Sequence, residues 1–139
     1  MSERNGKSVQ ISCAFPPGPD VVGHACLAEE LGYERVWLYD SPALYPDVWV
    51  SLARIAGSTE RIGLGPAVLV PSLRHPLTQA TAIATLEGLA PGRTVVAIGT
   101  GFTGRMTLGQ LPLPWADTRT YIATVKGLLA GEAMVVDGA

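Results

Sequence analysis

The sequence predicts an α/β fold built from TIM-barrel-type (β/α)8 units, with about half a barrel, four βα units, in the 139-residue chain. Segments rich in β-branched and aromatic residues alternate with longer segments of helical periodicity. The helical segments are long enough to serve as crossover connections, so neighbouring strands are expected to be parallel. The third strand-like segment, residues 61–70, is almost entirely apolar, which is typical of a strand covered on both faces.

Helix caps and chain breakers separate the first two units. Asp20 can cap the first helix, and Gly32 is placed to end it. Pro42 and Pro46 interrupt the chain after the second strand, and Asp47 can cap the second helix. The two strands are expected over residues 9–15 and 35–40, and the two helices over residues 21–31 and 48–56.

Glycine and proline also punctuate the last two units. Gly65-Pro66 interrupts the third strand and predicts a bulge or bend, because proline donates no hydrogen bond to a strand ladder. Pro91-Gly92 and Gly131 end the third and fourth helices. The remaining strands are expected over residues 61–70 and 94–99, the helices over residues 77–89 and 117–130, a loop over residues 100–114 and a short final strand over residues 133–138. This order fits either an open doubly wound sheet or part of a (β/α)8 barrel.

Composition and charge exclude several classes of protein. With 47% apolar and 16% charged residues the chain is expected to be globular, and a net charge of −2 without charge runs argues against a nucleic-acid partner. Cys13 and Cys26 lie in no metal-binding pattern, so we expect buried free thiols and no metal site. Residues 1–8 are polar and are expected to form a disordered tail without a signal sequence. No apolar stretch reaches the roughly 18 residues of a membrane helix, so we expect no membrane contact and a cytoplasmic location.

Candidate site residues gather near the expected carboxyl ends of the strands. Asp40 ends the second strand and would face the site of a barrel, unless it serves as a cap or turn residue. After the third strand, Arg74 could bind an anionic group and His75 could move a proton. Alternatively, Arg74 pairs with a carboxylate and His75 fixes the loop. Late in the third helix, Glu87 could hold a loop or could be solvated.

Residues 99–104 spell G-x-G-x-x-G directly after the fourth strand. A dinucleotide fingerprint would follow the first strand and open a helix at once, and neither condition is expected here. A small nucleotide-binding α/β domain therefore rests on this pattern alone. The pattern favours a tight strand-end loop, which either lets a ring or phosphate approach the backbone or is a purely structural turn.

Five segments in the correct order resemble the bacterial-luciferase-like flavin- and F420-dependent oxidoreductases. They cover residues 30–40, residues 59–65 with Arg74-His75-Pro76, residues 86–93, residues 96–101, and residues 128–132 with Asp137-Gly138. The resemblance extends over nearly the whole chain from Val9 and points to the methylenetetrahydromethanopterin reductase branch, which uses coenzyme F420. It implies that residues 9–139 form one domain, the N-terminal half of a luciferase-like TIM barrel.

The resemblance also implies an activity, hydride transfer between the ring of F420 or FMN and a small organic substrate. The third-strand bulge would back the ring, at a place where the family often holds a non-prolyl cis peptide. The end of the fourth strand would touch the polar edge of the ring, and the second-strand acid would sit near its reacting face. Relatives that use F420 often have a histidine after that acid, where this chain has Ser41. The candidate cofactor-binding residues are Ala67, Val68, Thr100 and Gly101, and the candidate catalytic residues are Asp40 and His75.

The number of units leaves a second hypothesis open. A (β/α)8 barrel takes about 250 residues, and four parallel strands alone leave both sheet edges and one face uncovered. The chain could hide these surfaces as a homo-oligomer, or it could be a piece of a longer or split enzyme. It could also be a truncated, non-catalytic half-barrel that dimerises or acts as an assembly module. The sequence thus predicts an oxidoreductase family and leaves open whether this chain alone is an enzyme.

Overall fold

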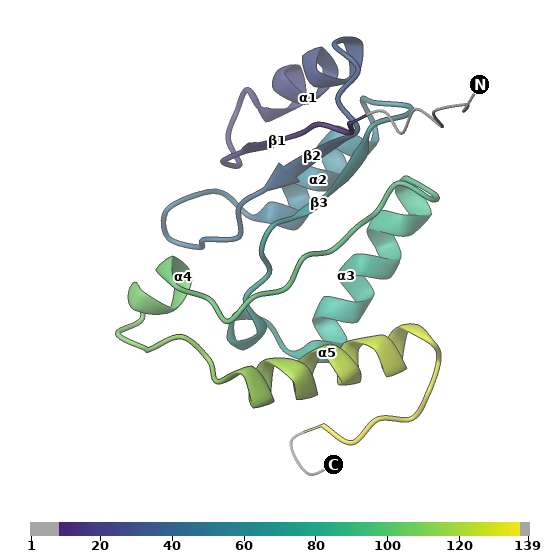
Figure 1. Cartoon of the computed structure of the whole chain (residues 1–139). Helices are drawn as coiled ribbons and strands as arrows, with labels where there is room; N and C mark the ends of the chain where they lie inside the picture. Colours follow the sequence, from purple (N-terminus) through teal and green to yellow (C-terminus); the bar gives the residue numbers. More distant parts are fainter. Residues whose placement is uncertain (1–8, 137–139) are drawn as a thin grey trace, which may run out of the picture.

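The computed structural model describes residues 9–136, which form an α/β structure with a three-stranded sheet in the order β1-β2-β3 (Figure 1). The strands are β1 (Ser12–Phe15), β2 (Arg35–Leu38) and β3 (Gly63–Pro66). The helices are α1 (Val21–Glu30), α2 (Val48–Ala56), α3 (Pro76–Leu89), the short α4 (Thr103–Met106) and α5 (Trp115–Leu129), and a 3-10 turn, η1 (Pro71–Leu73), precedes α3. Both strand pairs are parallel, which confirms the expected crossover arrangement.

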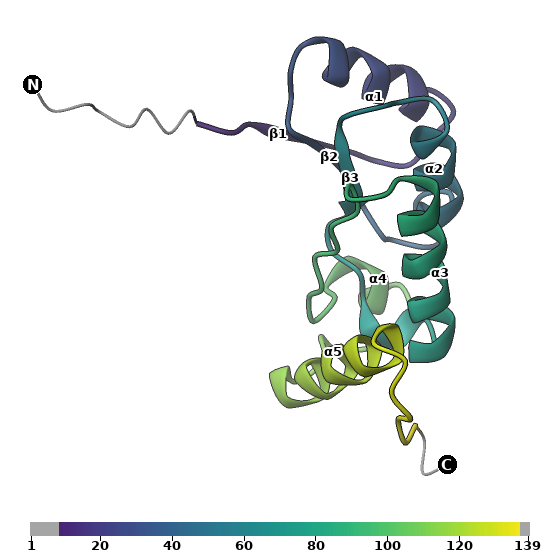
Figure 2. The same cartoon turned by 90° about the vertical axis from the view of Figure 1, so that its right-hand side faces the viewer.

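Helices α1, α2 and α3 cover one face of the sheet, as the two views in Figures 1 and 2 show. Alternate strand residues, such as Phe15 in β1 and Leu38 in β2, pack toward these helices because side chains alternate along a strand. The fully buried core consists of Val21, Ala25, Ala28, Val36, Leu38, Val48, Leu52, Ile55, Ala56, Ile62, Leu64, Leu69, Leu86 and Ala90. Ser12 and Ala14 are exposed on the opposite face, which no helix within residues 9–136 covers. The expected half-barrel layout, with an open inner face, is therefore present.

Residues 94–99 run beside β3 without forming a regular strand. Two isolated parallel bridges join Leu64 to Thr94 and Leu69 to Ile98. The bridges lie five residues apart along residues 64–69 and four apart along the other segment, so the β3 side carries one extra residue. This extra residue is the bulge expected near Gly65-Pro66, and it interrupts the ladder that a regular fourth strand would need.

The ends of the helices follow the expected caps, with one exception. Asp47 accepts hydrogen bonds from the N–H groups of Trp49 (2.8 Å) and Val50 (3.0 Å), and Gly32 follows α1 with a φ of 80°. Asp20 occupies the N-cap position of α1, but its side chain makes no capping hydrogen bond, so the expected Asp20 cap is wrong. Its ψ of 0° is far from the extended value of 131° at Asp47, and an N-cap side chain normally reaches its helix from an extended backbone.

Two expectations about the last third of the chain are also wrong. A helix does open at the glycine pattern, within its last two residues, because the N–H groups of Met106 and Thr107 donate to the carbonyls of Phe102 and Thr103 and close α4. Residues 133–136 do not form a strand, since Met134 instead packs closely on Gly127 of α5. The expected tail over residues 1–8 and positions 137–138 of that expected strand lie outside the described residues.

Several smaller features have clear outcomes. Glu87 accepts a hydrogen bond from the N–H of Gly92 (2.7 Å) and thus holds the turn after α3. Cys13 and Cys26 are free thiols, as expected, although both are partly exposed instead of buried. No helix in the described part of the chain is long and apolar enough to cross a membrane. Within residues 9–136, no group of three or more histidine, cysteine, aspartate or glutamate side chains could hold a metal ion.

Candidate functional site

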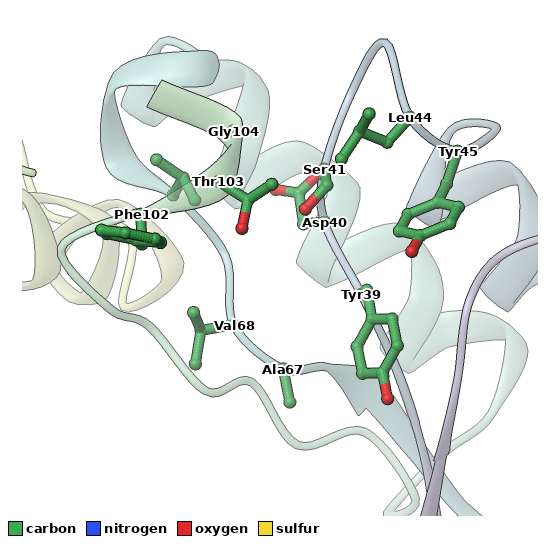
Figure 3. Close-up of a pocket in the computed structure, with 11 residues that line it drawn as sticks. Tyr39, Asp40, Ser41, Leu44, Tyr45, Ala67, Val68, Phe102, Thr103 and Gly104 are labelled. Carbon is green, nitrogen blue, oxygen red and sulfur yellow. The ribbon is translucent and has the colours of Figure 1, made fainter. Parts of the chain in front are cut away.

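A cavity of about 290 Å³, called the cleft below, opens where β2 and β3 end (Figure 3). Three segments line it: the residues that follow β2, the bulge that follows β3, and the first turn of α4. The lining residues are Tyr39, Asp40, Ser41, Leu44, Tyr45, Ala67, Val68, Val70, Phe102, Thr103 and Gly104. Barrel enzymes carry their sites at the carboxyl ends of their strands, so the cleft is the candidate site.

The bulge after β3 forms the floor of the cleft. The peptide bond between Ala67 and Val68 is cis, as the resemblance implied. The N–H of Ala67 donates to the carbonyl of Leu38 (2.8 Å), and the N–H of Leu69 donates to that of Ala97 (2.8 Å), so the sheet holds the bulge from both sides. Val68 stays 42% exposed, and Figure 3 shows its side chain beside Ala67 along the floor.

Thr100 and Gly101 lie next to the cleft without lining it. Gly101 has a φ of 77°, and a Cβ at this position would overlap the side chain of Val70, so only glycine fits here. The carbonyl of Thr100 accepts a hydrogen bond from the N–H of Leu113 (2.9 Å), which ties the loop back on itself. These two residues therefore place the turn at residues 102–104 that does line the cleft. Their contact with a ring edge stays a prediction.

Asp40 is the buried acid of the cleft, with 5% of its surface exposed. Its Oδ2 pairs with Nη1 of Arg74 at 2.7 Å, and Nη2 of the same guanidinium pairs with Oδ2 of Asp47 at 3.0 Å. Of the two roles considered for Arg74, pairing with a carboxylate is thus confirmed. A buried carboxylate is costly unless it is paired, so this ion pair is what allows Asp40 to lie in the wall.

The two carboxylates change the electrostatics of this corner. Burial lowers the pKa of Arg74, but the hydrogen bonds and charges of Asp40 and Asp47 outweigh burial and raise that pKa above its ordinary value. Burial raises the pKa of Asp47, yet the N–H of Val50 and the Arg74 guanidinium together bring it below its ordinary value. The guanidinium is therefore permanently charged and shared between two acids.

Tyr121 joins this network from α5, and the sequence offered no signal for it. Its hydroxyl donates to the main-chain carbonyl of Arg74 at 3.1 Å, across 47 positions of sequence. Burial raises the pKa of Tyr121 to about 12, so the phenol stays protonated and keeps donating at neutral pH. Helix α5 packs against α3, which begins two residues after Arg74, and this packing places Tyr121 near Arg74.

His75 lies at the N-terminus of α3, outside the lining of the cleft. Its Nδ1 accepts a hydrogen bond from the N–H of Leu77 at 3.2 Å, which caps the helix. The alternative in which His75 fixes the loop is thereby confirmed. A role for His75 in proton transfer stays a prediction.

Aromatic side chains form the walls of the cleft, and sequence reasoning missed them. The rings of Tyr39 and Tyr45 lie 6.2 Å apart at an interplanar angle of 46°. Phe102 lies across the cleft from Tyr45 in Figure 3. The position of Tyr39 beside Asp40, at a strand end, is the signal that could have drawn attention to this pair.

The sequence is similar to a known protein family and to curated proteins. A family model described as luciferase-like monooxygenase matches residues 3–139. An F420-dependent glucose-6-phosphate dehydrogenase of Beutenbergia cavernae is 38% identical over 138 residues, which cover 86% of this chain and 39% of the relative. A 5,10-methylenetetrahydromethanopterin reductase of Methanolobus tindarius is 31% identical over 122 residues, which cover 85% of this chain and 36% of the relative.

A solved structure extends the likeness to the fold. The oxygenating constituent of 3,6-diketocamphane monooxygenase from Pseudomonas putida, solved in complex with FMN, superposes with a TM-score of 0.78 at 18% identity. The match covers 93% of this chain and 41% of that structure. The βα units described above are therefore units of a luciferase-like TIM barrel. The chain spans about two fifths of the length of the curated relatives.

Proposed function

The chain belongs to the luciferase-like monooxygenase family, and on that premise we propose that it carries part of the active site of an F420- or FMN-dependent oxidoreductase. The reaction would transfer a hydride between the ring of the cofactor and a small organic substrate. F420 or FMN would supply the redox chemistry, and the protein would supply orientation and exclusion of water.

The cleft is the observation that carries this proposal. Its floor, at Ala67 and Val68, and its walls, at Tyr39, Tyr45 and Phe102, are apolar or aromatic, which suits a flat conjugated ring. The described lining holds no lysine or arginine, so it suits the ring of such a cofactor better than a phosphate group. Asp40, Ser41 and Thr103 add polar groups to this lining, which would orient a bound ring.

Each sequence-predicted residue has a proposed role. Ala67 and Val68 would back the ring, and Thr100 and Gly101 would support its polar edge by placing the first turn of α4. The charge of Asp40 would lie near the reacting face, where its ion pair with Arg74 keeps the carboxylate in place. His75 is the second candidate for proton transfer, and it would have to act from the N-terminus of α3.

Separate titrations with FMN and F420 test the proposal. We expect saturable binding, seen as a change in cofactor fluorescence, and we expect Val68→Trp to weaken it about tenfold or more by filling the cleft. Val50→Trp is the matched control, because Val50 is 64% exposed on α2. Absence of binding of either cofactor in the high micromolar range, in a folded wild-type chain, would rule out the proposed function.

The open face of the sheet favours a second candidate function, a half-barrel that assembles through that face. In that case the chain would form homo-oligomers without turning over a substrate. Cofactor binding with a substrate-dependent change in the absorbance of the cofactor would exclude it.

A further inference from the structure

We propose that Arg74 is a positioning residue that fixes both ends of the cleft's tyrosine-bearing wall, residues 41–46. The consequence for affinity rests on the proposed function: a fixed wall holds Tyr45 and Leu44 where a cofactor ring would stack. The fixing of the wall itself rests only on the geometry described next.

One guanidinium holds both ends of this wall. Asp40 immediately precedes it and pairs with Nη1 of Arg74 at 2.7 Å, and Asp47 immediately follows it and pairs with Nη2 at 3.0 Å. The two nitrogens belong to one rigid planar fork, so the distance between the two carboxylates is set by the side chain of Arg74. Lysine, with one compact ammonium group, cannot reproduce this spacing.

The ion pair of Arg74 with Asp40 is buried, whereas its ion pair with Asp47 is partly exposed to solvent. The side chain of Asp40 is 1% exposed and that of Arg74 is 15% exposed, whereas that of Asp47 is 47% exposed. Loss of Arg74 would leave the Asp40 carboxylate buried and without this partner, and a chain in that situation rearranges to rehydrate the charge. The rearrangement would begin at Asp40, which immediately precedes the wall.

The backbone of the wall gives an independent reason why it needs an external hold. Ala43 has a φ of 72°, a left-handed conformation that costs a residue with a Cβ about 1 kcal/mol or more. The backbone hydrogen bonds of the wall are internal: the N–H groups of Leu44 and Tyr45 both donate to the carbonyl of Ser41 at 3.1 Å. Unfavourable backbone conformations persist where surrounding contacts enforce them, and the two ion pairs of Arg74 are placed to do so.

Arg74 is itself held in place from another part of the fold. The hydroxyl of Tyr121 on α5 donates to its main-chain carbonyl at 3.1 Å. The contacts of Arg74 therefore connect the wall after β2, the cap of α2 and helix α5. We expect a substitution of Arg74 to alter the cleft, although the side chain of Arg74 itself would not contact a ligand.

The test uses the full chain labelled with 3-fluorotyrosine, in wild-type, Arg74→Gln, Arg74→Lys and Asp47→Asn forms. Asp47→Asn keeps a side-chain oxygen for capping α2, and it removes the charge and the Oδ2 acceptor that pair with Arg74. Arg119→Gln, on the exposed surface of α5, is the matched control. Fluorine NMR follows the four tyrosines, of which Tyr33 lies outside the cleft and serves as an internal reference.

We expect Arg74→Gln to shift or broaden the Tyr45 signal while the Tyr33 signal stays in place. Arg74→Lys and Asp47→Asn should give intermediate effects. Separate titrations with FMN and with F420 should show binding weakened about tenfold in Arg74→Gln and partly restored in Arg74→Lys, while Arg119→Gln binds as the wild type does. A purely structural role would lower the melting temperature without this graded response of Tyr45.

Two outcomes would overturn the proposal. One is an unmoved Tyr45 signal in Arg74→Gln; if that variant does not fold, an unmoved signal in both Arg74→Lys and Asp47→Asn decides in the same way. The other is a moved Tyr45 signal with cofactor affinity within about twofold of wild type. If the wild-type chain binds neither cofactor, the proposed function fails, and the fluorine signals alone decide whether Arg74 fixes the wall.

Discussion

Gly99 lies against the side chain of Val68, and this contact sets the shape of the cleft floor at the scale of single residues. A Cβ on Gly99 would lie 2.9 Å from Cγ2 of Val68, closer than carbon atoms tolerate. The N–H of Gly99 donates to the carbonyl of Leu69, and the N–H of Leu69 donates to the carbonyl of Ala97, so the two backbone segments are held in place. A shift of the Val68 side chain would therefore have to relieve the clash. The glycine thus serves the cleft through its missing side chain.

Gly99→Ala is therefore expected to destabilise the fold by about 1–3 kcal/mol through overpacking, and to weaken cofactor binding. Val68→Ala removes the atoms that clash, so the double variant should recover most of the loss. Chemical denaturation of the four proteins of this cycle measures the coupling free energy. Strictly additive effects of the two changes would contradict the proposed contact.

Glu29 acts at the same scale, at the opposite end of the sheet from the cleft. Its carboxylate accepts hydrogen bonds from three successive N–H groups, those of Glu60, Arg61 and Ile62, at 2.6–3.3 Å. Burial alone would raise the pKa of Glu29, but these donors outweigh burial and lower it below 4.5. A carboxyl group with a lowered pKa stabilises the fold above its unfolded-state pKa, and this contribution is lost as the pH falls through the folded-state pKa.

Glu29→Gln should accordingly lower the free energy of unfolding by about 1 kcal/mol at pH 7, and the difference from wild type should shrink as the pH falls below 4.5. Glu30→Gln is the matched control, since Glu30 is the exposed neighbour on α1. Urea unfolding at several pH values measures both variants. A difference that stays constant down to acidic pH would mean that the ionised carboxylate is not the group that matters.

At the scale of elements, the four long helices could be predicted closely, the short α4 was missed, and the strands could be predicted only in part. Helix α2 begins and ends where the sequence predicts, because its Asp47 cap and its apolar face are local signals. The strands are shorter than the apolar segments that contain them, since pairing depends on the neighbouring strand and not on local composition. The ladder of residues 94–99 is broken by the bulge that follows β3, and such a long-range cause is not visible in the periodicity of residues 94–99 themselves.

The candidate site follows the same division. Asp40 at a strand end and a bulge near Gly65-Pro66 could be predicted, because strand ends and a misplaced proline are visible in the sequence, whereas the place of the bulge at Ala67 and Val68 was implied by the family resemblance. The partners of Arg74 could not be chosen, since Asp40 and Asp47 lie 34 and 27 positions away and only folding brings them together. Tyr121 was missed for the same reason, as it comes from a helix on the far side of the long loop.

The two aspartates at helix N-termini give a prediction about elements. Asp47→Ala should destabilise the chain by about 1 kcal/mol or more, because it removes two capping hydrogen bonds and one ion pair. Asp47→Asn should recover the capping part. Asp20→Ala should change stability by no more than about 0.5 kcal/mol, because the Asp20 side chain makes no capping hydrogen bond. Thermal unfolding of the three variants checks this order, and equal losses at Asp20 and Asp47 would contradict it.

At the scale of the whole molecule, the helices cover one face of the sheet and leave the other open. On the open face, Ala14 of β1 is exposed and lies opposite Trp37 of β2 in the register of the strands. The guanidinium of Arg35 lies over the Trp37 ring at 5.2 Å, so this face is partly apolar and partly charged. The edge of β1 presents unpaired backbone groups that other strands pair with readily, and the uncovered face offers apolar surface that association would bury.

The 139-residue chain, when produced alone, is therefore expected to self-associate through this face. Ala14→Lys should shift the chain toward monomer, because a lysine on the open face of β1 brings charge repulsion and desolvation into any contact made there. Ala116→Lys, on the exposed surface of α5, adds the same charge elsewhere and should leave the assembly unchanged. Size-exclusion chromatography with light scattering gives the mass of each protein. A wild-type chain that is a monodisperse monomer, with little binding of a hydrophobic dye, would contradict assembly through the open face, whereas equal dissociation by both lysines would point to net charge as the cause.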